Sequence, residues 1–167
     1  MDVYQEKYTA LKKAYEQSGE LPFFRYHPNP LVTEAFPRAD SPVICDCCGK
    51  PVTIYYAGPF YSEEEIEALC PECISSGEAA EKFDGEFQDE YSLEEGVDSP
   101  EKLDELIHRT PGYQGWQQEY WCSHCGDYCA FIGYVGYREL EQMGIVEEIL
   151  NDPDCPVGGG QKTDREK

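Results

Sequence analysis

Apolar side chains recur at helical intervals near the start of the chain. Residues 2–17 carry one apolar stripe among Lys and Glu residues, which predicts an amphipathic helix. Pro22 prevents this helix from continuing, so we expect a peripheral N-terminal helix within residues 1–20. The residues of the stripe are Tyr4, Tyr8, Leu11 and Tyr15.

Two later stretches have the same period. Ser99 followed by Pro100 favours a helix start, and Pro111 is expected to end that helix. Residues 137–150 predict a final helix that breaks at Gly144. The packing stripes are Leu103, Leu106 and Ile107 in the first helix, and Leu140, Met143, Val146, Ile149 and Leu150 in the second.

Shorter patterns predict the elements in between. Residues 51–56 are rich in β-branched and aromatic side chains, which is typical of a strand. Ser62 with Glu65 three positions later forms a capping box, which predicts a short helix running into Cys70. Residues 78–83 have high helix propensity.

The remaining segments are less regular. Residues 21–30 contain three prolines, which keep their neighbours out of the helical region, so we expect an extended segment wrapping over a surface. Residues 113–135 are aromatic and β-branched, which predicts strands. Residues 151–167 are rich in Gly and mixed charge, which predicts a flexible tail. We therefore expect one α+β domain over residues 21–150.

The composition leaves this domain a thin aliphatic core. Leu, Ile, Val and Phe together account for 32 of 167 residues, or 19%, and the net charge is −21. Such values lie at the border of the intrinsically disordered class. Thirteen Tyr and nine Cys residues argue for a folded chain. The fold must therefore be stabilised by something besides aliphatic burial.

The charge also excludes several partners. Thirty-four acidic residues against 13 basic ones disfavour direct binding to nucleic acid or to anionic membranes. The sequence has neither an apolar run of about 20 residues nor an apolar leader, so we expect a cytoplasmic protein. Thiols stay reduced in the cytoplasm, so the nine cysteines are interpreted as metal ligands in preference to disulfides.

The strongest motif is a pair of C-x2-C sequences. Cys45 and Cys48 are followed after 21 intervening residues by Cys70 and Cys73, close to the spacing of structural zinc sites. Gly49 allows the chain to turn back directly after the second sulfur. Four thiolates complete a tetrahedral shell, which is typical of a structural site. The sequence therefore predicts a zinc-organised domain with a treble-clef or zinc-ribbon-like finger.

The expected zinc would supply the stability that the thin aliphatic core lacks. Structural zinc contributes on the order of 10–16 kcal/mol in small fingers. Two alternatives are a thioredoxin-type redox pair at Cys70 and Cys73, and unliganded buried cysteines. Redox motifs need no second pair and usually accompany a βαβ pattern, which is missing here, so we favour zinc.

A second knuckle lacks a partner pair. Cys122 and Cys125 are again two residues apart and are again followed by glycine, at Gly126. Three interpretations stay open: a second zinc site, packed thiols, and a functional thiol with His124 as base and Asp127 orienting it. The residues that could complete a second metal site are Cys129, His124, His108, His27 and Cys155. His27, between a tyrosine and a proline, is more typical of a packed loop residue.

Several segments together resemble the CbrC family of bacterial proteins. The resemblance covers roughly residues 21–145 and excludes the predicted N-terminal helix and the tail. The segments are Leu21–Pro30, Cys70–Ile74, Gly77–Phe83, Arg109–Tyr113 and Trp116–Cys129.

This resemblance implies no reaction, because the colicin-tolerance label attached to the family describes a phenotype. It emphasises His124, Cys125, Asp127 and Cys129 more than Cys122. The resemblance therefore favours a second metal site built from His124, Cys125 and Cys129, with Cys122 the less secure ligand.

The charge pattern suggests a binding function. Residues 61–107, here called the acidic segment, contain 17 acidic residues and two basic ones. Together with a closed metal shell and no phosphate loop or hydrolase motif, this predicts a non-enzymatic, zinc-stabilised acidic module that binds a protein partner, in particular a basic one. The alternatives are a thiol- or metal-dependent enzyme using residues 124–129, and an acidic inhibitor that mimics nucleic acid.

Overall fold

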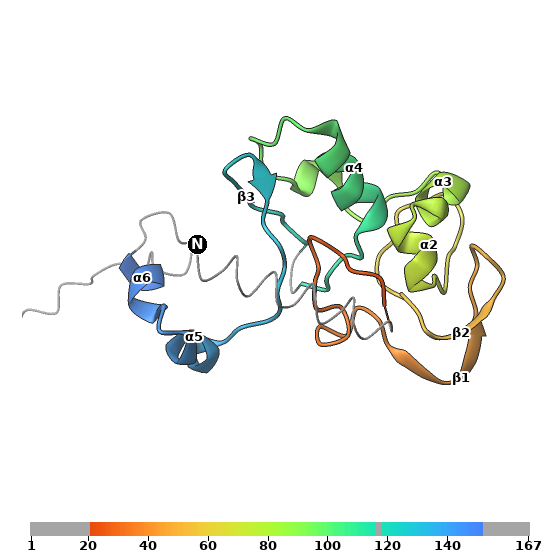
Figure 1. The fold of residues 1–167 in the computed structure, drawn as a ribbon, viewed down its shortest axis with the longest axis horizontal. Helices are drawn as coiled ribbons and strands as arrows, with labels where there is room; N and C mark the ends of the chain where they lie inside the picture. Colours follow the sequence, from red (N-terminus) through yellow and green to blue (C-terminus); the bar gives the residue numbers. More distant parts are fainter. Residues whose placement is uncertain (1–20, 116–117, 152–167) are drawn as a thin grey trace, which may run out of the picture. The chain divides into compact units, whose positions relative to one another are not determined.

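The computed structural model describes residues 21–115 and 118–151 (Figure 1). The helix predicted within residues 1–20 lies outside this part of the chain, as does the predicted tail from residue 152 onward. The chain divides into two compact units, the first ending at Gly133 and the second beginning at Tyr134.

The first unit begins with a β-hairpin. Strand β1, Arg38–Ile44, pairs antiparallel with β2, Pro51–Ile54, so that Ile44 lies opposite Pro51. Strand β2 confirms the predicted strand, whereas β1 was not expected, because its sequence contains a proline and several polar residues.

Short helices follow the hairpin and lie close together in Figure 1. The helix predicted at 78–83 is present, and so is the helix predicted after Ser99. The Ser99 hydroxyl oxygen accepts a hydrogen bond from the Lys102 amide, which caps the second of these helices. The helices are α2 at Pro71–Ser75, α3 at Glu78–Phe83, the 3₁₀ turn η1 at Glu90–Ser92, and α4 at Pro100–Arg109.

The helix predicted to run from Ser62 into Cys70 does not form. The amides of Glu67 and Ala68 donate to the carboxylate of Asp46 instead of to carbonyls of the same segment. Leu69 pairs with Tyr56 in an antiparallel bridge. Partners distant in sequence thus take the hydrogen-bonding groups that a local helix would use.

Of the strands predicted over 113–135, the described structure contains only a small second hairpin. Strand β3, Ser123–His124, pairs with β4, Asp127–Tyr128. Neighbouring residues pair singly with other segments: Trp121 bridges to Leu93, and the Phe131 amide donates to the carbonyl of Tyr26.

The core of the first unit consists of two hydrophobic clusters that are rich in aromatic side chains and cysteines. The proline-rich segment 21–30 supplies both, because Leu21 and Phe24 belong to the first and Tyr26 to the second. This segment is therefore buried between them instead of wrapping over a surface. The first cluster includes Leu21, Phe24, Phe36, Cys45, Tyr56, Leu69, Cys70, Cys73, Ile74 and Phe87, and the second Tyr26, Leu106, Trp121 and Tyr128.

The second unit contains two short helices, α5 at Tyr137–Met143 and α6 at Val146–Asn151. Gly144 separates them with a φ of 71°, which confirms the predicted break. Among the described residues no helix is long and apolar enough to cross a membrane.

His27 is a packed residue of the first unit, as its sequence context predicts. Its side chain has no exposed surface, and its ring meets Phe131 edge-on. Because a carbonyl only accepts hydrogen bonds, Nδ1 donates to Pro111 O at 2.9 Å, and Nε2 then accepts from the Thr33 hydroxyl at 2.7 Å. Burial lowers the pKa of His27 to about 4.

This histidine makes the fold sensitive to acid. The unfolded chain binds a proton near pH 6.5 and the folded chain only near pH 4, so its stabilisation is present above pH 6.5 and is lost as the pH falls between these values. We expect the unfolding free energy of the native protein to fall by about 2 kcal/mol more than that of a His27→Gln variant between pH 7 and pH 4.5. Urea unfolding at both pH values measures this difference, and equal losses would contradict a buried neutral imidazole.

Candidate metal centre

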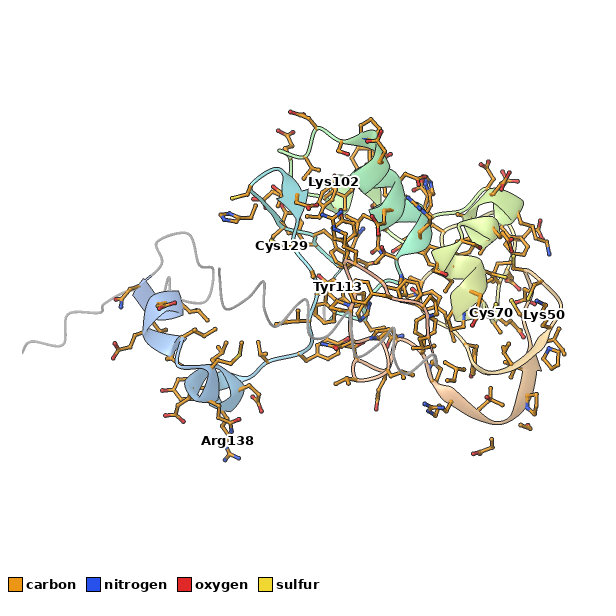
Figure 2. The ribbon with its side chains drawn as sticks, in the orientation of Figure 1. Lys50, Cys70, Lys102, Tyr113, Cys129 and Arg138 are labelled. Atoms are coloured by element: carbon orange, nitrogen blue, oxygen red, sulfur yellow. The ribbon has the colours of Figure 1, made fainter. Side chains whose placement is uncertain are left out.

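The four cysteines of the predicted zinc site converge. Cys45 and Cys48 lie on the loop between β1 and β2, while Cys70 and Cys73 lie at the start of α2. Their sulfur atoms all lie within 4.8 Å of one another. Three of the residues are buried and Cys48 is half-buried. We call this group the four-cysteine cluster, and Figure 2 shows Cys70 beside α2.

The spacing of the sulfurs fits zinc. A tetrahedral ion with Zn–S bonds of about 2.3 Å places its ligand sulfurs about 3.8 Å apart. The sulfurs of Cys48 and Cys70 are 3.8 Å apart. Soft thiolate ligands in a closed set of four favour zinc among the common biological cations. The four-cysteine cluster can therefore bind one metal ion and is consistent with a zinc site.

Local backbone geometry aims the sulfurs. Gly49 has a φ of 73°, and its amide donates to the carbonyl of Cys45 at 2.8 Å, which closes the loop between the strands. Pro71 begins helix α2 directly after Cys70. The amide of Cys70 donates to the sulfur of Cys45 at 3.2 Å, so the two halves of the cluster are already connected through the protein.

Asp46 and Lys82 support the cluster from outside, and neither was expected from the sequence. The Asp46 carboxylate accepts hydrogen bonds from the amides of Glu67 and Ala68, each at 2.9 Å. The Lys82 ammonium donates to the carbonyls of Asp46 and Cys47, at 2.8 and 2.7 Å. An aspartate inside a cysteine loop is a signal for such support, because its short carboxylate readily accepts from nearby amides. The lysine has no signal in the local sequence.

Two thiols of the four-cysteine cluster, those of Cys70 and Cys73, resist losing their protons. Burial raises the pKa of Cys70 to about 12 and also raises the pKa of Cys73. Burial acts the same way at Cys48, but hydrogen bonds from the Lys50 backbone and from neighbouring thiols outweigh it and lower the pKa. Because a metal binds thiolates, binding at this cluster must displace protons, and its affinity increases with pH.

Cys47 provides a fifth thiol beside the cluster. Its sulfur lies within 4.8 Å of the ligand atoms of Cys73 and Glu78. This smaller group shares Cys73 with the four-cysteine cluster, so both cannot be complete at once. The four-sulfur set has the better donors for zinc, which makes Cys47 a spare thiol.

Among the described residues, the second C-x2-C sequence does not assemble a comparable site. His124 and Cys125 lie at an exposed turn, where Cys125 has a φ of 53°. The groups of three or more ligand residues found in the described part of the chain do not include the residues of the second hairpin. His27 is buried in the core, His108 lies on α4, and Cys155 lies outside the described residues.

The carboxylate of Asp127 contacts structural partners and is not committed to orienting His124. The carboxylate pairs with Arg25, lies 3.4 Å from the Lys102 ammonium, and accepts a hydrogen bond from the Tyr26 hydroxyl at 2.9 Å. The thiol–histidine–aspartate arrangement considered from the sequence requires this carboxylate to orient His124. In the described structure it anchors the second hairpin to helix α4 and to the proline-rich segment.

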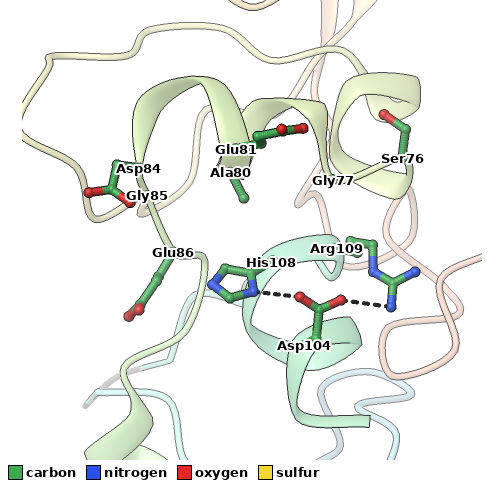
Figure 3. Close-up of a pocket in the computed structure, with 10 residues that line it drawn as sticks. All are labelled: Ser76, Gly77, Ala80, Glu81, Asp84, Gly85, Glu86, Asp104, His108 and Arg109. Carbon is green, nitrogen blue, oxygen red and sulfur yellow. Dashed lines mark hydrogen bonds and ion pairs between the residues drawn. The ribbon is translucent and has the colours of Figure 1, made fainter. Parts of the chain in front are cut away.

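A pocket of about 470 Å³ lies between α3 and α4 (Figure 3). Helix α4 contributes Asp104, which is 2.9 Å from both the His108 Nδ1 and the Arg109 guanidinium. The segment of α3 and its following turn contributes three carboxylates, those of Glu81, Asp84 and Glu86. Four carboxylates against one guanidinium give the pocket a negative character.

Residues 21–155 match a protein family described as "Uncharacterised protein family (UPF0167)". The chain belongs to the UPF0167 family. It is 42% identical over 126 residues to UPF0167 protein PA1536 of Pseudomonas aeruginosa, covering 74% of this chain and 69% of the relative. It is 45% identical over 136 residues to UPF0167 proteins Mb2317 of Mycobacterium bovis and MT2352 of Mycobacterium tuberculosis, covering 80% of this chain and 71% of each relative. No solved structure matches the chain.

Cys45 and Cys47 offer a matched test of the metal centre in this UPF0167 protein. Cys45→Ser removes a buried ligand, so we expect the variant to lose its bound zinc and most of its folded structure. Cys47→Ser removes the spare thiol, so we expect it to retain one zinc per chain and to change the unfolding free energy by less than about 1 kcal/mol. Elemental analysis and circular dichroism measure both outcomes. Equal zinc loss in the two variants would show that the ligand set is wrong.

Asp46 tests the support around the cluster. We expect Asp46→Ala to weaken zinc affinity about 10- to 100-fold, because the loop then loses its connection to residues 67 and 68. Asp40→Ala on the exposed part of β1 is the control, since it removes the same charge. Competition with a zinc-binding dye measures both affinities. Indistinguishable affinities in the two variants would contradict a supporting role for Asp46.

Proposed function

We propose that this UPF0167 protein is a zinc-stabilised acidic module that binds a basic protein partner and is not an enzyme. The chemistry of the four-cysteine cluster supports this proposal. Zinc held by four thiolates has no coordination position for a substrate, so the ion would organise the fold instead of taking part in a reaction. Its site lies in the first hydrophobic cluster, where Cys45, Cys70 and Cys73 are buried.

We further infer that the finger is of the treble-clef type. One cysteine pair comes from the loop of a hairpin, and the other comes from the first turn of helix α2. A zinc ribbon would instead take its second pair from another hairpin loop. The resemblance to the CbrC family stays a prediction.

The exposure of the acidic segment is the observation that carries the proposed function. Of its 17 carboxylates, 13 are exposed and none is buried. Charges arranged in this way attract a positively charged partner over a distance and accelerate its association.

The two lysines of this segment leave that charge largely unopposed. Lys82 donates to the carbonyls of Asp46 and Cys47, and Lys102 contacts the carbonyl of Gly126 and the carboxylate of Asp127. Both ammonium groups are thus engaged within the protein.

The pocket between α3 and α4 suits a basic side chain of such a partner. Arg109 already pairs with Asp104, which leaves the carboxylates of Glu81, Asp84 and Glu86 to face an incoming cation. An anion would meet net repulsion there. The narrower hypothesis, in which the acidic segment mimics nucleic acid, also requires a basic partner and stays a hypothesis.

A charged peptide tests the proposal. The probe is a fluorescent peptide rich in Lys and Arg, compared with a peptide in which glutamine replaces every basic residue, and the protein is the zinc-loaded full chain. We expect only the basic peptide to bind, with its affinity falling about tenfold or more between 0.1 and 0.5 M salt, since salt screens exposed charges. Neutralising Glu81, Asp84 and Glu86 as Gln, Asn and Gln should weaken binding about tenfold.

The control removes the same charge elsewhere. Glu141, Glu147 and Glu148 lie exposed on α5 and α6, and their replacement by Gln should leave the affinity within about twofold of the native value. Fluorescence anisotropy measures every affinity, and zinc content verifies that each variant is folded. A salt-independent affinity, or equal weakening in both triple variants, would contradict the proposal.

A further inference from the structure

The second hairpin brings two exposed cysteines face to face. Its register pairs His124 with Asp127 and Ser123 with Tyr128. One step further along both strands, Cys122 lies opposite Cys129, and the Cys129 amide donates to the Cys122 carbonyl at 2.8 Å. Figure 2 labels Cys129 on the segment that leaves the hairpin.

Both side chains lie on the same outer face. Directly opposed residues of an antiparallel pair point to one side of the sheet, and side chains alternate along each strand. Trp121 and Tyr128 are buried on the inner side. Cys122 and Cys129 therefore project outward, and both are exposed.

This geometry matches that of a disulfide. Opposed residues in a hydrogen-bonded antiparallel pair have Cα atoms about 5.5 Å apart, within the range of about 4.4–6.8 Å that disulfides require. Cys125 lies three positions from Cys122, which corresponds to about 10 Å along an extended strand. Cys129, and not Cys125, is therefore the partner that Cys122 can reach without backbone movement.

The end of the hairpin is anchored, which keeps the two thiols opposed. Asp127 pairs with Arg25 and Lys102, and the Lys102 ammonium also donates to Gly126 O at 2.8 Å. Slippage by one residue would move Tyr128 out of the second hydrophobic cluster. The register that faces Cys122 to Cys129 is therefore held by contacts outside the hairpin.

We propose that Cys122 and Cys129 form a reversible cross-strand disulfide, which makes the second hairpin a site of oxidative modification by small disulfides such as oxidised glutathione. One thiolate attacks a sulfur of oxidised glutathione, forms a mixed disulfide and releases one glutathione thiolate. The opposed cysteine, after losing its proton, then attacks the protein sulfur of the mixed disulfide and releases the second glutathione. The two protein thiols lose two electrons and two protons, and oxidised glutathione becomes two reduced glutathiones.

The surroundings of Cys122 and Cys129 make the first attack on a disulfide slow. Although both side chains are exposed, desolvation by neighbouring protein groups raises the pKa values of Cys122 and Cys129, and the nearby carboxylate of Glu94 adds to the increase at both. Each thiol is a poor nucleophile on its own under neutral conditions. What favours the bond is the fixed position of the second thiol beside the first, which makes the closing step intramolecular.

The test treats the zinc-loaded full chain with oxidised glutathione at about pH 8.5, where thiolates are more abundant. We expect the intact mass to fall by two hydrogens with one zinc retained. Non-reducing peptide mapping should find Cys122 joined to Cys129, and excess reduced glutathione should reverse the change.

Single variants locate the bond. Cys125→Ser should form the cross-link to the same extent as the native chain, while Cys122→Ser and Cys129→Ser should instead retain a glutathione adduct on the remaining thiol. Zinc content checks that each variant keeps its first unit folded.

Three outcomes would overturn the proposal. They are a bond from Cys122 to Cys125, a stable glutathione adduct on the native hairpin without closure, and a second zinc equivalent on the hairpin that prevents the reaction. The last of these would support the second metal site that the sequence left open.

Discussion

The convergence of four cysteine sulfurs between the β1–β2 loop and the start of α2 is the contact on which the rest of the first unit depends. Three of these residues belong to the first hydrophobic cluster, where thiols fill space that aliphatic side chains occupy in most cores. A metal bound at this point would cross-link the hairpin to the helix. Such a cross-link would stabilise a chain with a net charge of −21 and few aliphatic residues, since such a charge opposes compaction.

The four-cysteine cluster also positions the acidic segment. The loop from β2 to Cys70 is tied down at Asp46 and Tyr56, and the helices that follow pack against the cluster through Ile74, Ala79 and Phe83. The backbones of these short elements are held on the side that packs against the hydrophobic cluster. Their carboxylates therefore face solvent on the opposite side. The four-cysteine cluster and the proposed binding surface therefore lie on two sides of one arrangement, in which a bound metal would add stability and the carboxylates provide charge.

The two sequences that share the C-x2-C-G pattern fold differently. In the first C-x2-C-G sequence the Cys45 amide donates to the Lys50 carbonyl, and the four residues between them, which include Cys48, form the loop. In the second, His124 pairs with Asp127, and only two residues form the turn. The difference follows from the anchoring of Asp127 by Arg25 and Lys102, residues that the motif itself does not contain. Motif spacing therefore identifies a metal site only when a second pair converges on the first.

The sequence by itself determined what depends on neighbouring residues. The spacing of the cysteine pairs predicted the cluster, Ser99 and Pro100 predicted the start of α4, and Gly144 predicted the break between α5 and α6. Tertiary structure alone decided the rest, including the loss of the helix expected from Ser62 and the pairing that opposes two cysteines across the second hairpin. Backbone amides and carbonyls bond whichever partner the fold brings near, and a distant carboxylate or strand can displace a local one.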